Sequence, residues 1–120
     1  NFDVTNYYQA SCEGYPYAYT VLKDLIAYAH IKDGCVHIPE HGHREETMGG
    51  GMSGSLHGKN IQYPEIGSGA INFRGLLESL RRDNVTGYCT IEPHTNLDYW
   101  HIYAKREIDY LKTHGLTGVP

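Results

Sequence analysis

Alternating apolar and polar residues mark three short stretches of the chain as β-strands, because successive side chains of a strand point to opposite faces. These stretches are residues 1–6 (NFDVTN), 28–33 (YAHIKD) and 86–94 (TGYCTIEPH). We predict a further short strand at residues 61–66, which the glycine-containing turn at residues 67–69 closes. The last stretch is expected to be a buried strand. Pro93 should end it, since proline cannot continue a central ladder, and Glu92 then lies at its exit.

Apolar residues that recur at steps of three and four predict three amphipathic helices. They cover residues 18–29, 73–80 and 100–111. The first helix runs without a clear stop into the strand at residues 28–33, and the second ends near Asn84. We expect Asn96 or Asp98 to cap the last helix, Gly115 to follow its end, and Trp100 to lie in the core.

Residues 34–60 separate these elements and show no periodicity. They hold four histidines and the glycine-rich stretch at residues 49–54. A segment of this length without regular structure is usually a lid, a binding loop or disordered. The spacing of His41 and His43 occurs in metal sites, although such a pair in a loop more often binds no metal.

The order of the elements predicts an α/β fold. Strands that alternate with helices imply a parallel sheet with right-handed crossovers, and 120 residues suit one domain. The ionisable residues of the strands share one face near the carboxyl ends, whereas the other face is apolar. Both faces of an open doubly wound sheet should be apolar, but the inner face of a barrel can be polar at its top. We therefore predict half of a TIM (β/α)8 barrel, with helices outside and the long loop at residues 34–60.

Charge and cysteine usage restrict the partners and the compartment. The formal net charge is −4 and no block of basic residues occurs, so we expect neither nucleic acid nor a membrane surface as the main partner. Cys12, Cys35 and Cys89 lie far apart, as expected for free thiols in a reducing cytoplasm. The chain starts without methionine at a strand-like run, which suggests the interior of a longer polypeptide.

Three polar residues from different predicted strands should meet where the carboxyl ends of the strands lie together. They are Asp3, His30 and Glu92. Two carboxylates and an imidazole suit Mn²⁺, Mg²⁺, Co²⁺ or Zn²⁺, with Mn²⁺ as the first expectation. Three protein ligands with open positions are typical of a catalytic metal site. The alternative is that each residue caps its own strand independently.

Three segments together resemble a known family. AHIKD, PEIGSGAINFRGLLESL and GYCTIEPHT follow one another in the order found in the C-terminal half, strands five to eight, of xylose isomerase-like TIM barrels. The closest branch is the sugar phosphate isomerase/epimerase group. The resemblance covers the chain except residues 34–60, and it depends on the order and spacing of the segments rather than on any one motif.

The resemblance implies one divalent metal ion held by a glutamate, an aspartate, a histidine and a second glutamate, with the glutamates acting as acid and base. Asp3, His30 and Glu92 match three of the ligands, and Glu92 also matches one acid/base. The remaining glutamate belongs to a fourth barrel strand that this chain lacks. A missing N-terminal half-barrel or a complementing chain is therefore implied as a partner, together with oligomer formation, and the isolated chain should be inactive.

The implied activity is isomerisation or epimerisation of a sugar or sugar phosphate through an enediolate, after removal of a proton next to a carbonyl. Asn6 stands where the family often has a substrate-contacting histidine. Lys32 and Asp33 leave the same strand end and either contact substrate or form a simple ion pair. His94 either lines the mouth or lies in a surface turn.

Other functions remain open. The apurinic endonuclease branch carries additional zinc ligands where this chain has Ile61 and Tyr63, and the chain also lacks a basic block, so DNA repair is not expected. A related metal barrel that cleaves C-glycosides by a lyase-type reaction would use similar ligands. A non-catalytic half-barrel, used as a scaffold or a split subunit, belongs to a different class of function.

Overall fold

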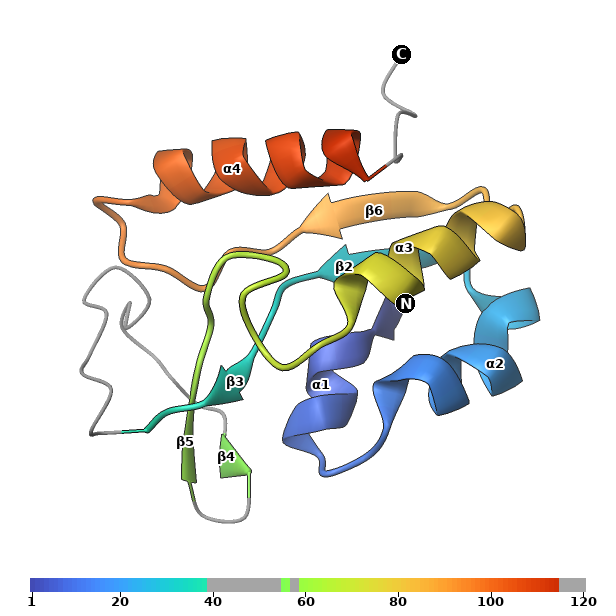
Figure 1. The fold of residues 1–120 in the computed structure, drawn as a ribbon, viewed down its shortest axis with the longest axis horizontal. Helices are drawn as coiled ribbons and strands as arrows, with labels where there is room; N and C mark the ends of the chain where they lie inside the picture. Colours follow the sequence, from blue (N-terminus) through green and yellow to red (C-terminus); the bar gives the residue numbers. More distant parts are fainter. Residues whose placement is uncertain (39–54, 57–58, 115–120) are drawn as a thin grey trace.

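The computed structural model describes residues 1–38, 55–56 and 59–114. Within them the chain forms a mixed α/β fold with a small parallel sheet and four α-helices (Figure 1). In chain order the elements are β1 (Phe2–Asp3), α1 (Val4–Gln9), the π-helical turn η1 (Gly14–Ala18), α2 (Tyr19–Leu22), the 3-10 turn η2 (Lys23–Leu25), β2 (Tyr28–Ile31), β3 (Cys35–Val36), β4 (Ser55–Leu56), β5 (Lys59–Gln62), α3 (Phe73–Arg82), β6 (Tyr88–Ile91) and α4 (Trp100–Thr113).

The parallel sheet has the order β1-β2-β6. Asp3 is the register partner of His30, and His30 is in turn the partner of Thr90. The ladder continues one step beyond β6, because the backbone N–H of Glu92 donates to the carbonyl of Ile31 at 3.0 Å. The carboxyl ends of all three strands therefore lie at one edge of the sheet.

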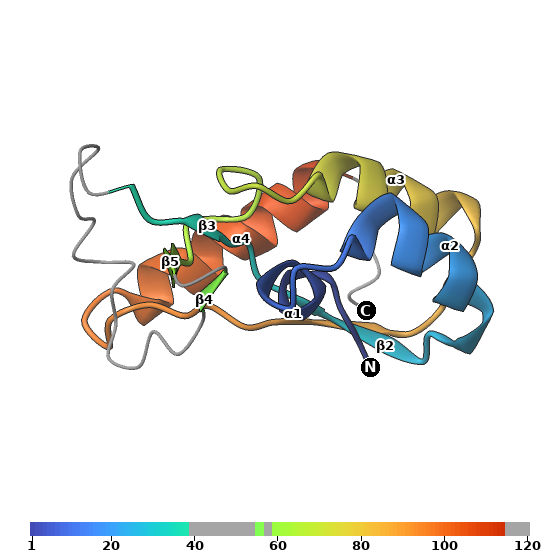
Figure 2. The same cartoon turned by 90° about the horizontal axis from the view of Figure 1, so that it is seen from below.

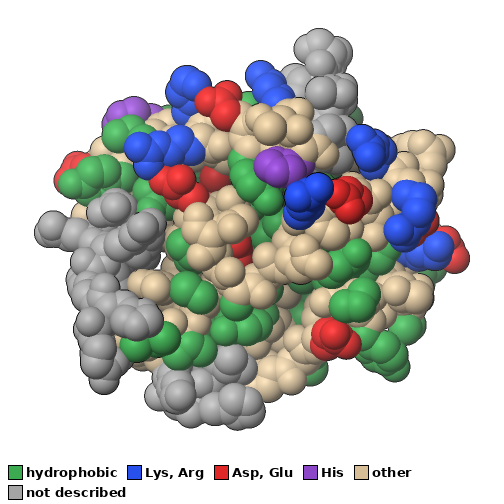
Figure 3. All heavy atoms as spheres, viewed as in Figure 1, with side chains coloured by type: hydrophobic (Ala, Val, Ile, Leu, Met, Phe, Trp, Pro, Cys, Tyr) green, Lys and Arg blue, Asp and Glu red, His purple; other side chains and the backbone are tan. Residues whose placement is uncertain are grey.

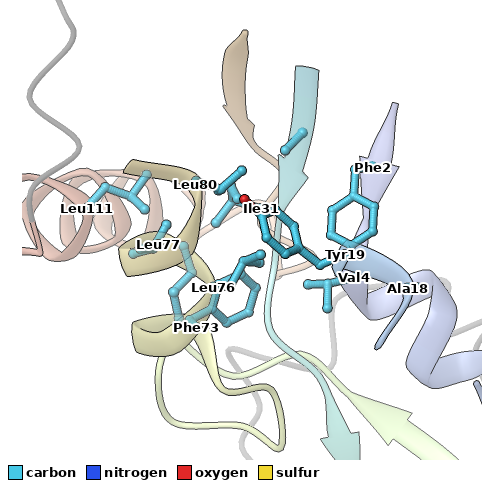
Figure 4. Packing of buried hydrophobic residues seen from close by; sticks show 12 residues of the cluster. Phe2, Val4, Ala18, Tyr19, Ile31, Phe73, Leu76, Leu77, Leu80 and Leu111 are labelled. Carbon is cyan, nitrogen blue, oxygen red and sulfur yellow. The ribbon is translucent and has the colours of Figure 1, made fainter. Parts of the chain in front are cut away.

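Helices cover one face of this sheet. Figure 2 shows α2 and α3 on the same side of β2. Buried apolar side chains of the sheet and of α1, α2 and α3 pack together in one core (Figure 4), which includes Phe2, Val4, Tyr19, Ala29, Ile31, Phe73, Leu76, Leu77 and Leu80. The helix α3 presents its apolar residues at the predicted three- and four-residue steps, and the Asn72 side chain caps it by accepting from the N–H of Gly75 at 3.0 Å. The prediction of a helix at residues 73–80 is confirmed.

The first predicted strand is shorter than expected. It ends at Asp3, and the helix α1 starts at Val4, because the Asp3 carboxylate accepts the first free N–H groups of that helix. The helix predicted at residues 18–29 ends early as well, since α2 and η2 stop at Leu25 before the chain enters β2.

The predicted strand at residues 61–66 does not join the parallel sheet. Residues 61–62 belong instead to β5, which pairs antiparallel with β3 and β4. The strand β6 pairs directly with β2, so no strand lies between them. Within the described residues the parallel sheet therefore has three strands instead of the expected four. The two ends of the segment at residues 34–60 form β3, β4 and the start of β5 in this antiparallel sheet. His41, His43 and the glycine-rich stretch lie outside the described residues.

The buried position expected for β6 is wrong. Tyr88 is 87 % exposed, and Cys89 and Thr90 are exposed too, because β6 is an edge strand within the described sheet. Trp100, which was expected in the core, is 56 % exposed at the start of α4. The expected cap of that helix is also wrong. Its N-cap is Tyr99 without a side-chain hydrogen bond, and Asn96 Oδ1 instead accepts from the N–H of Asp98 at 3.2 Å.

Charged side chains on the surface lie next to charges of opposite sign. On the face drawn in Figure 3, basic side chains stand beside acidic ones rather than in one block. Pairs such as Lys105–Asp109 and Arg74–Glu78 join residues one helical turn apart. Among the residues that the structure describes, no helix is both long enough and apolar enough to cross a membrane.

Candidate metal centre

Asp3, His30 and Glu92 come together at the carboxyl edge of the parallel sheet. One ligand atom from each lies within 4.8 Å of the others. The strand register explains this meeting, because Asp3 pairs with His30, and Glu92 lies two residues beyond His30's other partner and on the same face. The predicted convergence of these three side chains is therefore present in the structure.

Asp3 is held in a fixed orientation. It is 6 % exposed, and its Oδ1 accepts hydrogen bonds from the N–H groups of Thr5 at 3.1 Å and Asn6 at 3.0 Å. Its Oδ2 is buried and accepts no hydrogen bond from any described residue. The ammonium of Lys32 lies 3.0 Å from this oxygen as an ion pair, without the alignment of a hydrogen bond. One carboxylate oxygen is thus used by α1, and the other is left for a cation.

Lys32 lies between the two carboxylates. Its side chain is buried, and its Nζ donates to Glu92 Oε2 at 2.6 Å. Burial alone would lower the pKa of Lys32, but its contacts with Glu92 and Asp3 outweigh burial and raise that pKa above its usual value. Burial alone would raise the pKa of Glu92, but the hydrogen bond and charge of Lys32 lower it below its usual value. Both groups are therefore charged at neutral pH.

Two histidines flank Glu92. His30 Nδ1 lies 3.4 Å from Glu92 Oε2, and His94 Nε2 lies 3.8 Å from Oε1. Burial and the nearby charge of Lys32 lower the pKa of His94, so its imidazole is neutral at neutral pH. The two oxygens of Glu92 therefore differ, because Oε2 contacts His30 and Lys32 whereas Oε1 contacts only the neutral ring among these groups.

Asp33 points away from the cluster. Its carboxylate is 1 % exposed and accepts four backbone N–H groups, from Gly34, Gly67, Gly69 and Ile71, at 2.8 to 3.3 Å. Burial raises its pKa, and these hydrogen bonds oppose the rise. The structure thus gives Asp33 the role of fastening the glycine turn before α3.

Asn6 and His94 lie at the margin of the site. Asn6 is exposed in α1, and its backbone N–H donates to Asp3. The ring of His94 packs on that of Tyr63, with centroids 4.5 Å apart at 38°. The structure therefore places His94 beside Glu92, whereas Asn6 joins the site through its backbone.

Sequence reasoning missed Tyr63 as a member of this region. Its ring is 4 % exposed, and its hydroxyl accepts a hydrogen bond from Gln9 Nε2 at 2.5 Å. Burial raises the pKa of Tyr63, so the phenol stays neutral. The chain has 11 tyrosines, and nothing in the local pattern distinguishes this one.

The donor set fits a divalent cation. Carboxylate and imidazole ligands suit Mn²⁺, Mg²⁺, Co²⁺ or Zn²⁺, and the buried Oδ2 of Asp3 accepts no hydrogen bond from the part of the chain that the structure describes. Asp3, His30 and Glu92 are the residues that would hold the ion.

No protein-family model matches the chain, and no curated protein matches its sequence. The function is therefore proposed from the geometry of the cluster.

Proposed function

We propose that the chain contributes the C-terminal part of a xylose isomerase-like barrel and acts, once that barrel is complete, in a divalent-metal-dependent isomerase or epimerase of a sugar or sugar phosphate. The observation that carries the proposal is the meeting of Asp3, His30 and Glu92 at the carboxyl ends of parallel strands. Catalytic groups lie at this end of the strands in barrels of this architecture. The chain would supply β1, β2 and β6 to the wall of the barrel, because β5 does not join the parallel sheet.

The two faces of the sheet support a barrel wall. One face packs on α2 and α3. The other carries Tyr28, Tyr88 and Thr90, which are exposed, and leads to the cluster. An open inner face, and an edge of β6 that no strand of the described residues pairs with, suit a complementing N-terminal half-barrel or a second chain. The second glutamate of the proposed reaction would come from that partner.

Different residues of the chain would have different roles in the reaction. When bound, a divalent cation would act as a Lewis acid that polarises the sugar carbonyl and so acidifies the neighbouring C–H bond. Glu92 is ionised and half-buried, and its Oε1 is the oxygen that does not contact Lys32. We assign proton removal to Oε1. The carboxylate from the partner returns the proton, and Lys32 and His94 line the mouth where substrate enters.

One observation favours a second function. The ammonium of Lys32 already neutralises charge between Asp3 and Glu92, as in a structural ion-pair network. A non-catalytic half-barrel used for assembly would need nothing more from these residues. Metal binding separates the two functions, since only the enzyme requires it.

The test is titration of the chain with Mn²⁺, followed by electron paramagnetic resonance of free Mn²⁺. We expect one ion per chain, weaker binding in Glu92→Gln, and unchanged binding in Glu78→Gln, which alters an exposed carboxylate of α3. A wild-type chain that leaves all Mn²⁺ free would refute the metal centre and favour the scaffold. In the completed barrel, Glu92→Gln should abolish exchange of the substrate C–H hydrogen with solvent deuterium. Retained exchange would remove Glu92 as the acid/base.

A further inference from the structure

The ammonium of Lys32 occupies the space between the two carboxylates of the cluster. Nζ lies 2.6 Å from Glu92 Oε2 and 3.0 Å from Asp3 Oδ2. These are the two carboxylate oxygens directed at His30, whose Nδ1 is 3.4 Å from the first and 3.9 Å from the second. The position of Nζ is thus one that contacts both carboxylate ligands of the candidate metal centre.

The side chain of Lys32 has little freedom in this position. It is 6 % exposed. The backbone carbonyl of Lys32 accepts a hydrogen bond from the hydroxyl of buried Thr5, which holds the end of β2 against α1. An ammonium fixed at these distances excludes a second cation from the same two oxygens, because like charges so close together repel strongly.

We propose that Lys32 is the resident cation of the metal-free site, and that a divalent ion binds there by exchange with its ammonium group. This inference rests on the proposed metal centre and deepens it. In the metal-free protein the Lys32 ammonium compensates one of the two carboxylate charges, and binding of a divalent ion requires Nζ to leave. A divalent ion succeeds where a monovalent ion does not, since it brings twice the charge to the same oxygens.

The first measurement compares Mn²⁺ affinity by calorimetry in three proteins. They are the wild-type chain, Lys32→Met and Lys23→Met. The control removes another lysine that forms an ion pair, with Asp83 at 3.5 Å, on η2. We expect Lys32→Met to bind Mn²⁺ about ten- to a hundredfold more tightly, since the charge-assisted hydrogen bond to Glu92 and the ion pair with Asp3 no longer compete. Lys23→Met should bind as the wild type does. Weaker or equal binding in Lys32→Met would overturn the exchange.

The second measurement uses the wild-type chain and so does not depend on the folding of a variant. Lysines are acetylated briefly with acetic anhydride, with and without saturating Mn²⁺, and quantified by mass spectrometry. Lys32 should react slowly without the ion and at least about tenfold faster with it, as a buried amine becomes accessible, while the exposed Lys105 reacts equally in both. Bound Mn²⁺ with a protected Lys32 would overturn the exchange alone. The absence of any Mn²⁺ binding would overturn the metal centre and, with it, this inference.

Discussion

Glu107 should make the stability of the fold depend on pH. It lies on the buried side of α4, is 2 % exposed, and its Oε2 has no hydrogen-bond partner among the described residues. Burial, together with the negative charges of Glu65 and Asp33, raises the pKa of Glu107 from 4.5 to about 8. The folded chain therefore holds a proton at neutral pH that the unfolded chain releases.

The size of the effect follows from the two pKa values. Stability is unaffected by this group below pH 4.5, falls as the pH rises through the interval up to about 8, and is constant above it. Each unit corresponds to about 1.4 kcal/mol, so the loss has an upper limit of roughly 5 kcal/mol. That is a large fraction of the roughly 5–15 kcal/mol by which domains of this kind are stable.

The perturbation is Glu107→Gln, which keeps the shape and removes the ionisation. Urea unfolding, followed by circular dichroism at about pH 5 and about pH 9, gives the free energy of unfolding of each protein. The variant should unfold like the wild type at the lower pH and be more stable at the higher one. Glu78→Gln on exposed α3 is the control for losing a carboxylate. A difference between Glu107→Gln and wild type that stays the same at both pH values would refute the reasoning.

Three further substitutions test the fold around the site by urea unfolding. Asp33→Ala should cost at least about 3 kcal/mol, because four N–H groups lose their acceptor. A loss below about 1 kcal/mol would contradict this role. Gly87→Ala should cost about 3 kcal/mol or more, since a Cβ would lie 1.9 Å from the carbonyl oxygen of Ala27, and wild-type stability would show that β6 does not approach so closely. Tyr63→Phe should cost about 1 kcal/mol of stability, because Gln9 Nε2 loses the hydroxyl that accepts its hydrogen bond, and an unchanged value would mean that water replaces this acceptor.

Short-range sequence patterns were sufficient to predict the three residues at the centre of the site. Alternation along the strands placed Asp3, His30 and Glu92 on one face, and parallel order placed their strand ends at one edge. The same alternation separated the core residues Ala29 and Ile31 from the polar face.

Strand pairing between distant segments could not be predicted from these short-range patterns. The run at residues 61–66 is compatible with a parallel or an antiparallel neighbour, and in the structure its first two residues pair antiparallel with β3. Alternation along β6 also does not tell how many neighbours a strand has, so the exposure of Tyr88 was missed. Asp33 resembled a site residue because it follows Lys32, whereas its partners come from a turn far along the chain.

The direct pairing of β2 with β6 makes the cluster sensitive to strand alignment. Slippage by a single position would turn Glu92 toward the helices and put Ile91 or Pro93 in the position that Glu92 now occupies. Gly87 opposes such slippage, because its backbone touches that of Ala27 at the start of the pair and no other residue type fits there. The glycine just before β6 thus sets the alignment on which the carboxylate just after that strand depends.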